Sequence, residues 1–127
     1  MTFQLEGSAK LTDILSFDTI LDRDEMLEVD RIASRPRWQF GATSDHNFPH
    51  KKFWKMDVKG TAMFDTYIPE KMEILLPFKF EILDYYMNGH THGLDGSIHR
   101  DASDYTFLLY CNPQWDLMWG GKTIFVQ

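Results

Sequence analysis

The chain has 127 residues, of which 43% are hydrophobic and 15% aromatic, so it is long enough for one domain with a hydrophobic core. Nineteen acidic residues against 13 basic ones give a formal net charge of −6, which argues against nucleic acid and anionic membrane surfaces as partners. One cysteine, Cys111, excludes an internal disulfide framework, and the simplest expectation is a reducing, cytoplasmic location. Apolar runs of only a few residues predict no membrane span.

The first half of the chain predicts helices with short strands between them. Residues 22–32 place apolar side chains among charges with the period of an amphipathic helix. One strand is expected within 37–48 and another over 53–58. The Pro-Glu pair at 69–70 suits the first turn of a second helix, which should end before Pro77.

The second half predicts strands. Residues 78–87 form a partly alternating strand, and the glycine-rich stretch 88–96 is a loop. Two further strands are expected over 106–111 and 122–126. Helices followed by antiparallel strands indicate a mainly β fold with N-terminal helices, in the α+β class.

His99 and Asp101 are the candidate metal ligands. Residues two apart in an extended segment point to the same face, so both side chains can reach one ion. Imidazole with carboxylate suits Fe(II), Mn(II) or Zn(II), and non-haem Fe(II) oxygenases use two histidines and one carboxylate. Taken alone, the His-x-Asp tripeptide is a weak signal, because a surface histidine beside a solvated aspartate is common.

The surrounding stretch, 85–125, resembles the prolyl-4-hydroxylase-like branch of the 2-oxoglutarate/Fe(II)-dependent dioxygenases. Its parts follow the order of that family: a tyrosine-rich strand, an Asn-Gly loop, His99-Arg100-Asp101, a strand ending in Tyr110-Cys111-Asn112, Trp115 two residues past Pro113, and Gly120-Gly121 before a last strand. Residues 37–58 resemble, more loosely, the N-terminal region of small microbial and phage members.

The resemblance implies a double-stranded β-helix, or jelly roll, with iron near one open end. It implies that His99 and Asp101 are the first two metal ligands. It further implies that Tyr86 donates a hydrogen bond to 2-oxoglutarate and that Tyr110 lines the co-substrate pocket. Tyr85 is adjacent to Tyr86, and a shift of one residue would reverse which of them faces the site.

The implied reaction is hydroxylation of a C–H bond, coupled to oxidative decarboxylation of 2-oxoglutarate to succinate and carbon dioxide. Peptidyl proline is the substrate that the branch suggests, with other protein, peptide or small-molecule substrates left open. Ascorbate as a reductant is implied by the family alone.

The family also needs a second histidine and a basic residue well beyond the aspartate. The five histidines are at 46, 50, 90, 92 and 99, so none follows Asp101. We therefore expect 1–127 to be the N-terminal part of a longer jelly-roll enzyme, with a support region over 1–77 and the first core strands over 78–127. Unpaired strands would then favour a homo-oligomer.

Two other interpretations stay open. His90 and His92 share a face if their segment is extended, which would suit a cupin-like or local metal site together with His99 and Asp101. Alternatively, the chain is an inactive fragment or pseudo-enzyme that serves as an oligomerising or binding module. Trp115 and Trp119 flank the Gly-Gly pair, and packing is the default expectation for both.

Overall fold

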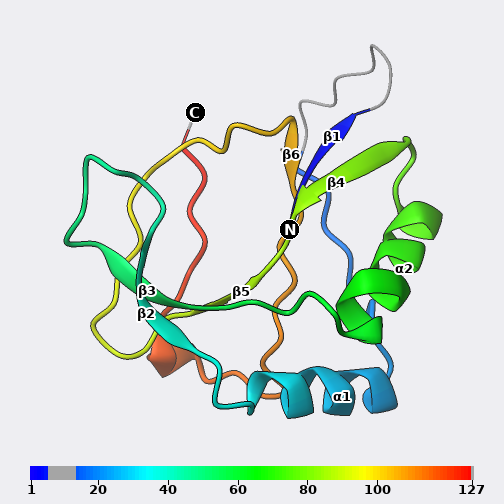
Figure 1. Cartoon of the computed structure of the whole chain (residues 1–127), viewed down its shortest axis with the longest axis horizontal. Helices are drawn as coiled ribbons and strands as arrows, with labels where there is room; N and C mark the ends of the chain where they lie inside the picture. Colours follow the sequence, from blue (N-terminus) through cyan, green and yellow to red (C-terminus); the bar gives the residue numbers. More distant parts are fainter. Residues whose placement is uncertain (6–13, 127) are drawn as a thin grey trace.

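The computed structural model describes residues 1–5 and 14–126. Two three-stranded antiparallel sheets and two main helices make up the fold (Figure 1), with strand orders β4-β1-β6 and β2-β3-β5. The strands are β1 (Thr2–Leu5), β2 (Gln39–Thr43), β3 (Lys52–Met56), β4 (Phe80–Asp84), β5 (Met87–Gly89) and β6 (Tyr105–Thr106). The helices are α1 (Arg23–Ala33), η1 (Met63–Tyr67), α2 (Ile68–Leu75) and η2 (Leu117–Trp119).

Helix α1 confirms the prediction for 22–32. Asp22 is its N-cap: its side chain accepts a hydrogen bond from the Glu25 N–H at 2.9 Å, and the Glu25 carboxylate accepts the Asp22 N–H at 2.8 Å. This reciprocal capping box satisfies two backbone donors that the first turn would otherwise leave unpaired. Val29 and Ile32 lie on the buried face, as the apolar period predicts.

The second helix begins earlier than Pro69, so that predicted boundary was wrong. The chain is already helical at Ala62 and passes through a π-helical segment, η1, in which the N–H of Ile68 donates to the carbonyl of Met63. A proline lacks an N–H and its ring crowds the carbonyl four residues back. The wider π turn immediately before Pro69 accommodates that defect, so the helix continues to Leu75.

The single strand predicted over 78–87 is two strands in two different sheets. β4 ends at Asp84 and pairs with β1, whereas β5 begins at Met87 and pairs with β3. Tyr85 and Tyr86 lie between them, where the chain crosses from one sheet to the other (Figure 1). Which sheet a strand joins depends on partners distant in the sequence, and an alternating pattern does not contain that information.

The two C-terminal strands are shorter than predicted or missing. β6 is only Tyr105–Thr106, although burial continues to alternate as far as Cys111. Residues 122–126 form no strand, and all their side chains are exposed. A strand needs a neighbouring strand to pair its backbone groups, and no strand among the described residues pairs with 122–126.

One hydrophobic core holds the two halves of the chain together. Its buried members come from α1, β3, η1, α2 and β5 and from the segments just before α1 and just after β3. They are Leu21, Val29, Ile32, Met56, Val58, Met63, Phe64, Ile68, Met72 and Met87. Helix makes up 25% and strand 18%, which is a mixed α+β architecture rather than a mainly β one. None of the described helices has the length and apolar character needed to cross a bilayer.

Candidate functional site

His99 and Asp101 lie side by side. The His99 Nε2 and the Asp101 Oδ1 are 3.5 Å apart, and the two side chains are 34% and 38% exposed. Two ligands about 2.1 Å from one metal ion, at roughly a right angle, lie about 3 Å apart. The pair is therefore close to the spacing that two ligands of one ion would have, and it is open to solvent.

Each of the two side chains is held by a second hydrogen bond on its far side. The His99 Nδ1 lies 2.8 Å from the carbonyl oxygen of Ser97. A carbonyl only accepts, so Nδ1 carries the proton of this contact, and Nε2 is the ring nitrogen that faces Asp101. The hydroxyl of Thr106 donates to Asp101 Oδ2, which leaves Oδ1 directed toward His99. Outer-shell bonds of this kind orient metal-binding side chains in known sites.

One hydrogen bond links the loop that carries the pair to the sheet. Residues 97–101 belong to no helix or strand. Thr106, in contrast, lies in the edge strand β6, where it pairs with Thr2 of the central strand β1. The hydrogen bond from Thr106 thus ties Asp101 to a strand whose position is fixed by its ladder.

The pKa of Tyr86 is influenced by Asp101, one member of this pair. Burial raises the pKa of its phenol, and the carboxylates of Asp101 and Asp84 raise it further. The Lys55 ammonium stands 3.8 Å from the centre of the Tyr86 ring, a cation–π contact that fixes the ring on β3. The pKa of the Tyr86 phenol therefore lies above its ordinary value, and Lys55 is the neighbour that contacts its ring.

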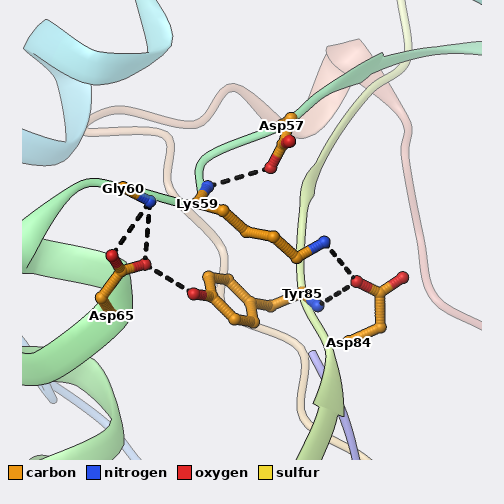
Figure 2. Close-up of polar contacts among 6 residues, drawn as sticks. All are labelled: Asp57, Lys59, Gly60, Asp65, Asp84 and Tyr85. Atoms are coloured by element: carbon orange, nitrogen blue, oxygen red, sulfur yellow. Dashed lines mark hydrogen bonds and ion pairs between the residues drawn. The ribbon is translucent and has the colours of Figure 1, made fainter.

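The neighbouring Tyr85 points into a separate polar network, which Figure 2 shows. Its hydroxyl donates to Asp65 of η1 at 2.5 Å, and Asp65 also accepts the N–H of Gly60 at 2.9 Å. Asp84 accepts both the Tyr85 N–H at 2.9 Å and the Lys59 ammonium at 2.6 Å. The network joins the end of β4 to the turn before η1, and it directs Tyr85 away from Asp101.

A pH titration of stability should reveal the Tyr85 contact. The hydrogen bond to Asp65 is the main cause that raises the Tyr85 pKa to about 12 from an ordinary 10.0. The folded state therefore favours the protonated phenol, a stabilisation fully present below pH 10 and lost as the pH rises through about 12. We expect the wild-type free energy of unfolding to fall more steeply from pH 10 to 12 than that of Tyr85→Phe. Tyr67→Phe, at an exposed tyrosine on η1, should follow the wild type; identical curves for all three would contradict the assignment.

Tyr110 lies on the surface. Its ring is mainly exposed, and its hydroxyl bonds with the hydroxyl of Thr123. No hydrogen bond or ring contact among the described residues joins Tyr110 to His99 or Asp101, so its predicted role at a co-substrate pocket stays a prediction. Cys111, next to it, is partly buried with its thiol 3.5 Å from the Leu109 carbonyl, and burial raises its pKa to about 11, as suits a structural thiol.

His90 and His92 do not complete a metal site. His90 stacks on Phe53 with ring centroids 5.3 Å apart, on the β3 side of the molecule. Within residues 1–5 and 14–126, no three His, Cys, Asp or Glu side chains gather in a way that would hold an ion. The local cluster of His90 and His92 with His99 and Asp101 is therefore wrong for the described part of the chain.

Two residues that contact the candidate site residues were not predicted from the sequence. Thr106 is five residues past Asp101, and its position in β6, which pairs with β1, places its hydroxyl at the carboxylate. Lys55 is 31 positions before Tyr86 and meets it because β3 and β5 pair with Lys55 opposite Asn88. Neither spacing forms a motif, so no signal in the sequence indicates them.

Removing the Thr106 hydroxyl should weaken metal binding without unfolding the chain. Thr106→Val keeps the shape and the β-branch but leaves Asp101 free to rotate. We expect a roughly 10–100-fold loss of Fe(II) or Co(II) affinity, the usual effect of losing an outer-shell partner. Thr106→Ser should restore most of it, and Thr91→Val in an exposed turn is the control. Equal affinities for Thr106→Val and the wild type would show that the contact does not orient Asp101.

Comparison with known proteins adds no relative. No family model matches the chain, and no curated protein or solved structure matches it. The functional assignment therefore rests on the residues and their geometry.

Proposed function

We propose that the chain carries the His-x-Asp part of a 2-oxoglutarate- and Fe(II)-dependent oxygenase of the prolyl-4-hydroxylase-like type, built on a double-stranded β-helix. The observation that carries the proposal is the orientation of His99 and Asp101. Each has one polar atom engaged in an outer hydrogen bond, and the remaining atoms, Nε2 and Oδ1, face each other at 3.5 Å.

The residues present fit two of the three protein positions in a two-histidine, one-carboxylate iron site. A third ligand is not supplied by the part of the chain that the structure describes. His99 would bind the ion through Nε2 and Asp101 through Oδ1. Imidazole nitrogen and carboxylate oxygen are both ligand types that suit Fe(II). When bound, Fe(II) with 2-oxoglutarate would activate dioxygen for the hydroxylation of an unactivated C–H bond, with 2-oxoglutarate oxidised to succinate and carbon dioxide in the same reaction.

The remaining side chains have supporting roles in this proposal. Tyr86, kept protonated by burial and by Asp101, would donate its hydroxyl to a carboxylate of 2-oxoglutarate. Tyr110 would take part only if its bond with Thr123 opened, so Tyr86 is the stronger candidate. Peptidyl proline is the proposed substrate class, ascorbate the proposed reductant and the cytoplasm the proposed location.

An anaerobic titration tests the proposal. The full chain is mixed with Fe(II) and then with 2-oxoglutarate, and the visible spectrum is recorded. Chelation of the ion by the keto acid in a protein site gives a weak charge-transfer band, which we expect here. Metal binding without the band would support a binding module rather than an oxygenase, and no metal binding at all would contradict both.

Turnover provides the second readout. Admitting oxygen to the loaded chain should release succinate from 2-oxoglutarate. A band without succinate would mean that the chain binds Fe(II) and 2-oxoglutarate but lacks a group needed for the reaction. The first group to add as a separate molecule would then be the third metal ligand.

A further inference from the structure

A pocket of about 450 Å³ opens on the surface at the short helix η2. The residues that line it are Gln114, Trp115, Asp116, Leu117 and Trp119. Its volume lies within the range of roughly 300–1,000 Å³ that small-molecule sites occupy. It shares no lining residue with the candidate iron site, so it is a second place at which a small ligand could be held.

Two tryptophans form adjacent walls of this pocket. The rings of Trp115 and Trp119 lie 5.6 Å apart, centre to centre, with an angle of 81° between their planes. The two residues are 49% and 61% exposed, so neither ring is enclosed in the core. In such an edge-to-face arrangement, a ligand in the corner between the rings can lie within about 6 Å of both ring centres, beside a face of each.

The local backbone holds the two rings in this arrangement. The Oδ1 of Asp116 accepts the Met118 N–H at 2.8 Å, and its carbonyl accepts the Trp119 N–H at 2.9 Å, which forms the turn of η2. Gly121, at a φ of 70°, lies against the other ring, because a Cβ there would come within 2.9 Å of Trp115. Glycine therefore suits position 121, where a side chain would displace one wall of the pocket.

The pocket is negative. Asp116 is the one charged residue among those that line it, and it forms no ion pair within the described part of the chain. Its hydrogen-bond partner, the Met118 N–H, carries no net charge and does not neutralise the carboxylate. The faces of both indole rings are also negative, because the π electrons lie there. Together with the net charge of −6 on the chain, these features favour a cation and disfavour an anion.

We propose that the pocket of Trp115 and Trp119 binds a methylated ammonium group of the kind that choline carries. Tryptophan attracts cations more strongly than the other aromatic side chains, and paired aromatic walls suit quaternary ammonium ligands. An unmethylated ammonium is strongly hydrated and brings three N–H donors, which indole faces satisfy poorly. A quaternary ammonium has no N–H, so its methyl groups can pack on both rings while Asp116 supplies the opposite charge.

Isothermal titration calorimetry of the full chain, without Fe(II) or 2-oxoglutarate, tests this proposal separately from the oxygenase assignment. Choline is the probe, and the matched control is the uncharged alcohol in which carbon replaces the nitrogen of choline. We expect saturable binding of choline and about tenfold weaker binding of the alcohol, since only choline has the charge that the ring faces attract. Equal affinities for the two ligands, or no saturable binding of choline, would overturn the proposal.

Three variants locate the binding. Trp119→Ala removes one wall and should weaken choline binding about tenfold. Asp116→Asn removes the charge but keeps an oxygen that can accept the Met118 N–H, and it should weaken binding severalfold. Tyr67→Ala, at an exposed tyrosine on η1, is the control and should bind like the wild type. Circular dichroism should show that all three are folded, and a wild-type affinity in Trp119→Ala would contradict the site.

Nuclear magnetic resonance on the wild type gives a readout that does not depend on any variant. Choline should shift the indole N–H signals of Trp115 and Trp119. The signal of Trp38, which does not line the pocket and whose Nε1 donates to the Ala33 carbonyl at 2.8 Å, should stay in place. Equal shifts at all three would overturn the proposal. A short peptide that contains trimethyllysine, titrated beside choline, distinguishes a peptide source of the methylated ammonium group from a free one, because the tighter ligand identifies the source.

Discussion

Replacing Asp101 with alanine is expected to abolish specific Fe(II) binding. The variant removes Oδ1, which faces His99 Nε2 at 3.5 Å, and no other acid among the described residues gathers there to take its place. Loss of an outer-shell partner alone lowers metal affinity about 10–100-fold, so loss of a direct ligand should exceed about 100-fold. Anaerobic titration with Fe(II), or with Co(II) as a coloured substitute, measures the change.

Asp101→Asn separates the charge of this residue from its shape. The amide keeps an oxygen that can accept the Thr106 hydroxyl, but it is a much poorer metal ligand. It should therefore lose affinity nearly as strongly as the alanine variant. Asp95→Ala, which removes an exposed carboxylate 3.9 Å from Lys51, should leave affinity unchanged. An unchanged Fe(II) affinity in Asp101→Ala would contradict the assignment of this site.

His99→Ala should have an effect of similar size, since it removes the other proposed ligand. His90→Ala provides the control, because that ring stacks on Phe53 and does not reach Asp101 in the described structure. A loss of affinity in His90→Ala equal to that in His99→Ala would indicate a different ligand set. It would then favour the histidine-rich loop as the metal site.

The largest expected effect on stability is that of Met72→Ala. Met72 is on the inner face of α2, 0% exposed, among residues from α1, β3 and β5. Truncating a fully buried methionine removes its apolar transfer free energy and leaves a cavity, a loss of about 2–5 kcal/mol. Single domains are stable by only about 5–15 kcal/mol, so urea unfolding should show a large shift in midpoint.

Ile74→Ala on the same helix is the comparison. Ile74 is 84% exposed, so its replacement should change the free energy of unfolding by less than about 0.5 kcal/mol. Both measurements belong at a concentration where the chain is monomeric, because self-association adds to apparent stability. Equal losses for the two variants would mean that α2 does not bury the face assigned to it.

Local chemistry explains which elements were predictable. The sequence around α1 contains its own start signal in Asp22 and Glu25 and its own apolar period, and both act within a few residues. Strand β2 likewise falls inside its predicted range, and β3 begins one residue before the predicted 53–58, since their aromatic and β-branched residues favour extended backbone over a short span. The pairing of His99 with Asp101 is local too, which is why a tripeptide was enough to expect it.

The features that could be predicted from the sequence are local ones: α1 with its cap, the strands β2 and β3, and the candidate ligand pair. The tertiary structure was needed to show that 78–87 divides between two sheets, that Tyr85 bonds to Asp65 while Tyr86 contacts Lys55, and that Thr106 donates to Asp101. It was also needed to show that no described strand pairs with 122–126. The physical reason is that ladder partners, side-chain neighbours and burial depend on residues far along the chain, whereas caps and periodicity depend on residues within one or two turns.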